Sequence, residues 1–187
     1  VGREVLMEME KAPAAAGDPV LEVEDLTVED DRGVEAVVDT SLTVRDGEVF
    51  GIAGVDGNGQ TELVEAITGL RPAETGTIRL EGTDITEDPR LDRIHDGMAY
   101  IPEDRQSRGL VMDFDLVGNG ILGSQHSPPF AERGQLDWTE AGRHAEAIVD
   151  EYDVRPGNTG AAAASLSGGN QQKFIVGREF ERDPRLM

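Results

Sequence analysis

The chain has 187 residues, which allows one domain with a sizeable core but would be crowded for two. Its formal charge of −21 argues against a nucleic-acid partner, because contacts with phosphates need clustered cations. Only Lys11 and Lys173 are lysines, and so acidic a surface with so little lysine is typical of proteins dissolved in molar salt. We therefore expect a halophilic source, with an ordinary acidic cytosolic protein as the alternative.

Other features narrow the class of protein further. No run approaches the roughly 18 to 20 consecutive apolar residues of a membrane span, and no leader sequence opens the chain, so we expect a soluble cytoplasmic protein. The absence of cysteine excludes disulfides and thiolate metal sites. His95, His126 and His144 show no ligand spacing, and we expect them to be solvated or locally bonded.

The first elements are a linker and two strands. Residues 1–19 include a stretch rich in Pro, Ala and Gly without apolar periodicity, which is typical of a linker. Apolar and polar residues then alternate over 21–28 and again over 34–44, and each run ends in a turn. These runs predict antiparallel strands with one face in water.

A strand, a glycine-rich loop and a helix come next. Residues 49–53 do not alternate, as is typical of a strand covered on both faces of a parallel sheet. Apolar residues from Leu63 to Leu70 recur at helical spacing, and Gly69 marks the end of that helix. This order of elements is that of a nucleotide-binding βα unit.

The second half is predicted to be mainly helical. Residues 77–80 and 98–101 predict short strands, and a helical pattern begins near Asp104. Thr139 is the expected cap of a helix whose apolar stripe runs from Ala141 through Ala145, Ile148 and Val149 to Tyr152. We expect Trp138 just outside this helix, as a packing anchor.

The glycine-rich loop, residues 54–61, matches the phosphate-binding pattern G-x-x-x-x-G-K-[ST] except that Gln60 replaces the lysine. Its glycines allow backbone N–H groups to surround a phosphate, and Thr61 would supply a hydroxyl for Mg²⁺. The candidate nucleotide-binding residues here are Gly54, Asp56, Gly57, Asn58, Gly59, Gln60 and Thr61.

This loop lacks the positive charge that such loops carry. A neutral amide in place of the lysine loses a charge-assisted contact of about 1.5 to 3 kcal/mol. Glu62 follows in the first helical turn, where it would repel a bound nucleotide. The loop is therefore predicted to keep the shape of a phosphate cradle without its charge.

A second motif spans residues 166–173, Leu-Ser-Gly-Gly-Asn-Gln-Gln-Lys, and precedes a helical pattern. Ser167 is a natural N-cap. Gly168 and Gly169 would each cost that helix about 1 kcal/mol relative to Ala, which favours a close approach of the backbone to another group. An anion such as a γ-phosphate fits this place.

These residues carry a family resemblance. The octet 166–173 resembles the signature motif of ATP-binding cassettes in the form typical of sugar-type importers. Residues 101–105, followed by 109–111, resemble the segment of the second cassette in which Glu103 replaces the Q-loop glutamine. The opening residues 1–6 resemble the end of the first cassette plus linker, especially in the nucleoside branch.

The resemblance implies an α/β fold, that of a P-loop NTPase of the ATP-binding-cassette type. Its mixed sheet would be accompanied by an antiparallel β-subdomain and a helical subdomain. We assign residues 1–19 to the linker between cassettes, 20–103 to the β and P-loop core, 104–166 to the helical subdomain and 167–187 to the signature helix. Walker B, the D-loop and the switch histidine are not found before Met187, so we expect a cassette that is incomplete at its C-terminus. An aromatic residue to stack on adenine is also missing around residues 32–34.

The implied function is that of an ATPase subunit that powers uptake of a sugar or nucleoside. Its implied partners are membrane permeases, a solute-binding protein acting indirectly, and the first cassette of the same polypeptide or of a dimer mate. In such head-to-tail pairs, one ATP site would be completed by Ser167, Gly168, Gly169 and Gln171. The other site, at 54–61 with Glu103 and a Mg²⁺ on Thr61, would be weak or inactive. The subunit would lie at the inner face of the membrane, and the isolated chain should not hydrolyse ATP.

Two other functions remain open from the sequence. A regulatory or structural cassette would bind nucleotide, or nothing, and only support dimerisation. A non-transport cassette in translation or DNA repair would carry basic patches or an inserted coiled coil, and the sequence shows neither.

Overall fold

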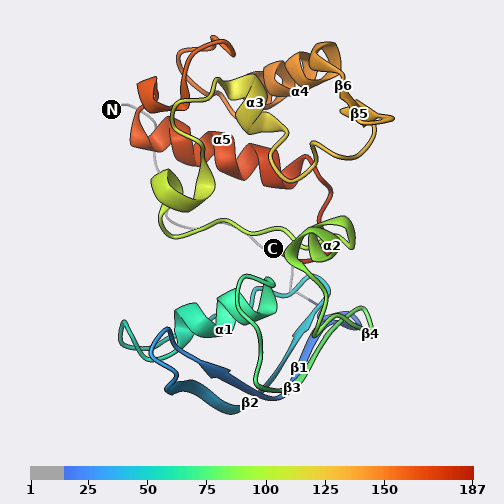
Figure 1. Cartoon of the computed structure of the whole chain (residues 1–187), viewed down its shortest axis with the longest axis vertical. Helices are drawn as coiled ribbons and strands as arrows, with labels where there is room; N and C mark the ends of the chain where they lie inside the picture. Colours follow the sequence, from blue (N-terminus) through green and yellow to red (C-terminus); the bar gives the residue numbers. More distant parts are fainter. Residues whose placement is uncertain (1–14) are drawn as a thin grey trace. The chain divides into compact units, whose positions relative to one another are not determined.

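The computed structural model describes residues 15–187, which form two compact units, one ending at Asp88 and the other beginning at Pro89. Figure 1 shows the elements of each unit. Residues 1–14, which hold most of the expected linker, lie outside the described residues.

The first unit is built on an antiparallel sheet in the order β2-β1-β3-β4. These strands are β1 (Pro19–Glu29), β2 (Glu35–Arg45), β3 (Thr75–Leu80) and β4 (Thr83–Asp84). The two strands predicted from alternation are confirmed as β1 and β2, and the one predicted at 77–80 is confirmed as part of β3.

Helix α1 (Gln60–Ile67) packs against β1 and β2 of this sheet (Figure 1). Its buried apolar residues Leu63, Ala66 and Ile67 recur at helical spacing, which is why this stretch forms a helix with one covered face. The helix ends at Ile67 with Thr68 as its C-cap, and Gly69 follows with φ 72°, in agreement with the helix end predicted there.

The prediction of a buried strand at residues 49–53 is wrong for this structure. The segment belongs to no sheet, and Val49 is 94% exposed, with Phe50 and Ile52 also exposed. A strand buried on both faces needs neighbours that pair with it and helices that cover it. Within residues 15–187 no strand pairs with this segment.

The second unit is mainly helical. Its elements are α2 (Arg90–His95), a π-helical turn η1 (Arg105–Gly109), α3 (Leu116–Gly120), the hairpin β5 (Ala131–Glu132) and β6 (Gln135–Leu136), α4 (Trp138–Glu151), a 3₁₀ turn η2 (Ala163–Ser165) and α5 (Gly168–Phe180). A core containing Leu116, Ile148 and Phe174 packs α3, α4 and α5 together (Figure 1).

The apolar stripe predicted for α4 is confirmed, but its start is not. Asp137, rather than Thr139, caps the helix, because its carboxylate accepts hydrogen bonds from the N–H groups of Thr139 and Glu140. Trp138 is the first helical residue and is 59% exposed, so the prediction of a packing anchor outside the helix is also wrong.

The strand predicted at residues 98–101 is reduced to one parallel bridge between Met98 and Leu186. Ala99 N–H donates to the carbonyl of Leu186 at 2.8 Å, and Met98 and Ala99 are buried. A single bridge does not make a strand. The apolar pattern nevertheless identified Met98 and Ala99 correctly as buried.

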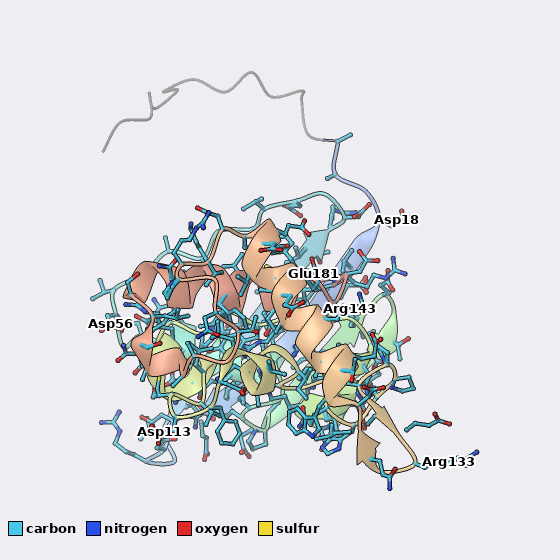
Figure 2. All side chains as sticks on the ribbon, turned by 90° about the horizontal axis from the view of Figure 1, so that it is seen from above. Asp18, Asp56, Asp113, Arg133, Arg143 and Glu181 are labelled. Carbon is cyan, nitrogen blue, oxygen red and sulfur yellow. The ribbon has the colours of Figure 1, made fainter. Side chains whose placement is uncertain are left out.

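Charged side chains cover the surface of both units. The labelled Asp56, Asp113, Arg133 and Glu181 are exposed, and Arg133 projects from the tip of the β5–β6 hairpin (Figure 2). In the part of the chain that the structure describes, no helix is long and apolar enough to cross a membrane.

Candidate functional site

The glycine-rich loop ends against strand β2. Gly57 and Gly59 have φ values of 80° and 93°, the left-handed region that favours glycine. A Cβ on Gly59 would also overlap the backbone carbonyl of Ala36. Both constraints arise within the chain, so contacts among the described residues account for glycine at position 59.

Gln60 folds back over this loop. Its Oε1 accepts a hydrogen bond from the Asn58 N–H at 3.2 Å, and its Nε2 donates to the Val55 carbonyl at 3.3 Å. The amide lies so close to Gly54 that a Cβ there would overlap Nε2. The Gln60 side chain therefore fills the loop and occupies the backbone N–H of Asn58.

The side chains described around the loop are mainly polar and acidic, and Arg32 is paired with Asp30. Asp56 and Thr61 are exposed, so the Thr61 hydroxyl is open to solvent. The pKa of Arg32 is raised mainly by its hydrogen bond to Asp30, with a smaller contribution from Glu62. The turn between β1 and β2 therefore lies near the start of α1, and Arg32 is already paired with a carboxylate there.

The second motif lies where α5 begins, and part of it is open to solvent. Ser167 is the N-cap, and its Oγ accepts a hydrogen bond from Asn170 Nδ2 at 3.0 Å. Ser167 and Gly169 are exposed. A Cβ on Gly169 would meet nothing within 4 Å, and its φ is not positive, so nothing described in the chain requires glycine at this position.

Gly168 differs from Gly169, because the side chain of Arg105 covers it. A Cβ there would lie 2.7 Å from Nη2 of Arg105 and 3.3 Å from its Cζ. Nε of Arg105 is buried and has no hydrogen-bond partner among the described residues. No local sequence pattern links η1 to the start of α5, so the approach of Arg105 to Gly168 could not be predicted from the sequence.

Gln171 is turned into the core. It is 1% exposed, and its Nε2 donates to the carbonyls of Ala163 and Leu166. Its Oε1 accepts from Gln106 Nε2 at 3.3 Å. In this structure Gln171 ties α5 to η1 and to the preceding turn, and its expected contact with nucleotide stays a prediction.

Glu103 lies on the surface beside η1. It is exposed, and no hydrogen bond or ion pair of its side chain is found in residues 15–187. The next residue, Asp104, caps η1, and hydrogen bonds from Ser107 and from the Gln106 N–H lower its pKa. The Asp104 carboxylate is thus engaged with the backbone, while that of Glu103 is open to solvent.

His95 and His126 make local hydrogen bonds, as expected, whereas His144 makes a ring contact. His95 Nε2 lies 3.1 Å from Ser127 Oγ, and the ring of His144 lies 4.9 Å from that of Phe130. Burial, followed by the charges of Arg182 and Arg143, lowers the pKa of His144. Among the described residues no cluster of histidines and carboxylates is suited to a metal ion.

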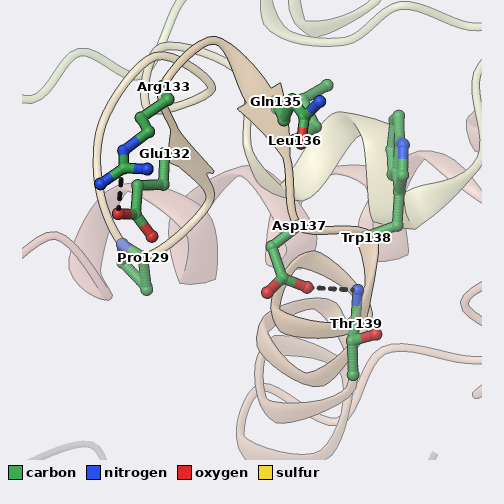
Figure 3. A pocket seen from close by; sticks show the side chains of 8 residues that line it. All are labelled: Pro129, Glu132, Arg133, Gln135, Leu136, Asp137, Trp138 and Thr139. Carbon is green, nitrogen blue, oxygen red and sulfur yellow. Dashed lines mark hydrogen bonds and ion pairs between the residues drawn. The ribbon is translucent and has the colours of Figure 1, made fainter.

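A surface hollow of about 570 Å³ lies beside the β5–β6 hairpin (Figure 3). Trp138 lines it, together with Glu132 and Arg133. Both of these side chains are exposed, and Arg133 Nε lies 3.9 Å from Glu132 Oε1. Asp137 also lines it, but its carboxylate is used to cap α4. The hollow contains none of the residues that the sequence analysis assigned to nucleotide.

Comparison with known proteins identifies relatives over the whole chain. Residues 37–187 match the family described as "ABC transporter". The chain is 46% identical over 187 residues to "Guanosine import ATP-binding protein NupO" of Bacillus subtilis and 43% identical over 189 residues to "Glucose import ATP-binding protein TsgD13" of Haloferax volcanii. These alignments cover 100% of this chain but 37% and 34% of the two relatives, so the chain spans about a third of their length.

Solved structures share the fold at low sequence identity. A nucleotide-free ATP-binding cassette from an ABC transporter superposes with a TM-score of 0.71 at 22% identity, covering 89% of this chain and 66% of that one. The cassette MJ0796, in a dimeric post-hydrolysis state bound to ADP and Pi, gives 0.69 at 19% identity, covering 88% and 70%. The α/β cassette fold expected from the sequence is therefore confirmed, and the chain belongs to the ABC transporter family.

Proposed function

We propose that this chain is the second ATP-binding cassette, up to the segment before Walker B, of an importer for sugars or nucleosides. The names of the relatives support this class, since they describe import of guanosine, nucleosides, glucose and other sugars. The whole protein would act at the inner face of the membrane with permease subunits and, indirectly, a solute-binding protein. The acidic, lysine-poor composition and a relative from Haloferax support a halophilic source.

The two motifs contribute unequally to ATP binding in this proposal. The start of α5, with Ser167, Gly168 and Gly169, completes a competent ATP site on the first cassette of the same polypeptide or of a dimer mate. The single observation that carries this assignment is Gly169. It is exposed, unhindered and conformationally unconstrained, so a close approach from outside the described chain accounts best for its missing side chain.

The loop at 54–61 forms the weaker site. Gln60 brings no charge and occupies the Asn58 N–H, so a nucleotide has to displace a neutral side chain without gaining a lysine contact. Thr61 remains open and would supply one hydroxyl ligand to Mg²⁺. In this proposal the chain supports ATP hydrolysis mainly through the nucleotide bound to the other cassette.

The chain offers a matched pair of serines to test this function. Ser167→Ala removes a hydroxyl at the start of α5, whereas Ser165→Ala removes an exposed hydroxyl whose hydrogen bond goes to the Ala162 carbonyl. In the full-length protein with its permease, we expect Ser167→Ala to lower kcat/KM for ATP roughly tenfold or more, the cost of a charge-assisted contact. Ser165→Ala should stay within about twofold of the wild type.

The outcome also separates the alternative functions. A regulatory or dimerisation cassette predicts that ATP hydrolysis is indifferent to Ser167→Ala. A non-transport cassette predicts hydrolysis that does not rise when substrate-loaded solute-binding protein is added to the reconstituted permease. The isolated chain, titrated with ATP, should bind weakly and show no turnover above a buffer blank.

A further inference from the structure

Arg105 combines features that the proposed function does not yet use. Its guanidinium lies over Gly168, with Nη2 2.7 Å and Nε 3.6 Å from the position of a Cβ on that glycine. No hydrogen bond or ion pair of this guanidinium is found in the described part of the chain, and Nε is buried. A buried donor without a partner costs about 1 to 3 kcal/mol, so an unused Nε calls for a reason.

Among the described residues no carboxylate pairs with the guanidinium of Arg105. Acidic residues number 38 against 17 lysines and arginines, so carboxylates are plentiful. Asp104 is adjacent in sequence, but its side chain accepts hydrogen bonds from the N–H groups of Gln106 and Ser107. The charge of Arg105 is the weakest of the influences on the pKa of Asp104.

The position of Arg105 is fixed by contacts on the other side of η1. Gly109, at the end of this turn, accepts a hydrogen bond from Arg178 Nη1 at 2.9 Å through its carbonyl. A Cβ on Gly109 would lie 2.7 Å from Ile175 Cδ1, so η1 packs directly on α5. Gln106 adds its hydrogen bond to Gln171. The turn and the helix therefore hold the guanidinium at the exposed start of α5.

We propose that Arg105 is a ligand for the terminal phosphate of the nucleoside triphosphate that the start of α5 meets. This inference rests on the proposed function, because it requires that Ser167 and Gly169 face a nucleotide bound by another cassette. Arginine presents a planar set of donors that suits phosphate oxygens, and the backbone N–H groups at a helix N-terminus attract the same anion. Arg105 would also bring to this site the positive charge that the loop at 54–61 lacks.

A contact with the terminal phosphate predicts a nucleotide-selective defect. In the full-length protein, Arg105→Ala should lower kcat/KM for ATP by roughly ten- to a hundredfold. The affinity for ADP, which lacks that phosphate, should change by less than about twofold. Arg105→Lys should recover part of the loss because it keeps the charge, and Arg105→Gln should not. Arg133→Ala, which removes a 92% exposed arginine from the hairpin, is the matched control and should have no effect.

The reference variant Ser167→Ala separates failure of this inference from failure of the proposed function. If Ser167→Ala impairs ATP hydrolysis and Arg105→Ala does not, the role of Arg105 is overturned and the proposed function stands. If neither impairs it, the proposed function fails. Equal losses for ATP and ADP in Arg105→Ala would overturn the terminal-phosphate contact and indicate a structural role.

A stability measurement tests the geometry even if Arg105→Ala folds poorly. Gly168→Ala should destabilise the wild type, because its Cβ meets the guanidinium, but should be neutral or stabilising in the Arg105→Ala background. The four proteins of this cycle can be compared by urea unfolding at one KCl concentration. Additive effects would mean that the guanidinium does not lie over Gly168, which overturns the inference.

Discussion

The loop at 54–61 and the start of α5 both combine glycines with a helix N-terminus, yet their glycines serve different ends. Gly59 is required by the chain itself, through its φ of 93° and the carbonyl of Ala36. Gly169 is required by nothing among the described residues. The loop is closed by the amide of Gln60, whereas the start of α5 is open and lies beside Arg105, whose buried Nε has no hydrogen-bond partner among the described residues. A glycine-rich loop can thus be required by the fold alone, as at Gly59. A glycine that the fold does not require, such as Gly169, is the better indication of a contact with a ligand.

The two motifs should differ most in how a glycine-to-alanine substitution changes the free energy of unfolding. Gly59→Ala forces a Cβ into left-handed backbone and into a carbonyl, and should lower the free energy of unfolding by about 2 to 4 kcal/mol. Gly169→Ala should raise it by up to about 1 kcal/mol through helix propensity, while lowering ATP hydrolysis in the full-length protein. Urea unfolding of both variants measures this. Loss of stability in Gly169→Ala would show that the chain itself needs that glycine.

A lysine at position 60 should strengthen nucleotide binding at the loop 54–61, which is the weaker of the two motifs. Gln60→Lys supplies the missing charge and should tighten nucleotide binding at the loop by about ten- to a hundredfold in equilibrium titration. Turnover should not rise in proportion, because Glu62 and Glu103 remain. Gln135→Lys, on the exposed β6, adds the same charge away from the loop and is the control. Equal binding by the two variants would contradict the account of Gln60.

Salt should change the stability of the whole chain by a smaller amount. The formal charge of −21 repels itself until ions screen it, so the melting temperature should rise between about 0.1 and 2 M KCl. The binding of nucleotide near Glu62 should also improve over that range, because the same screening acts on the phosphates. A melting temperature that does not change with KCl would remove the inference of a halophilic source.

The smallest expected effect is a pH dependence at His144, away from both motifs. Its pKa is lowered in the folded state by burial and by nearby arginines, so the unfolded state binds a proton first as pH falls below about 6.5. The contribution of neutral His144 to the free energy of unfolding is fully present above about pH 6.5 and declines as the pH falls below it. His144→Phe should flatten the acidic side of the stability curve, and nucleotide binding should not change. An unaltered curve would contradict the role of burial.

Most strands and helices of the fold could be predicted from the sequence, and the wrong predictions have physical causes. Alternation in β1 and β2 and the stripe in α4 depend on neighbours within each unit, so local patterns were sufficient there. The segment 49–53 depends on partner strands that residues 15–187 do not supply, so its apolar run did not yield a strand.

The candidate site shows the same limit. Gln60 and Gly169 stand at motif positions, so the sequence could identify both as candidates. The orientation of Gln60 into its own loop, the burial of Gln171 and the approach of Arg105 to Gly168 are tertiary contacts. No periodicity or spacing encodes such contacts, because they depend on side-chain packing between segments distant in the sequence.

The central claim, that the two motifs serve ATP hydrolysis unequally, is tested most directly by two substitutions in one preparation of the full-length protein. Gly168→Asp places a carboxylate against Arg105 and at the start of α5, and should abolish ATP hydrolysis. Thr61→Ala removes only a hydroxyl from the closed loop, and should lower hydrolysis less than tenfold, or about 1.4 kcal/mol. Both are to be measured at saturating ATP and molar salt, with transport assayed beside hydrolysis. If Thr61→Ala is as damaging as Gly168→Asp, the loop is catalytic and the unequal assignment is wrong.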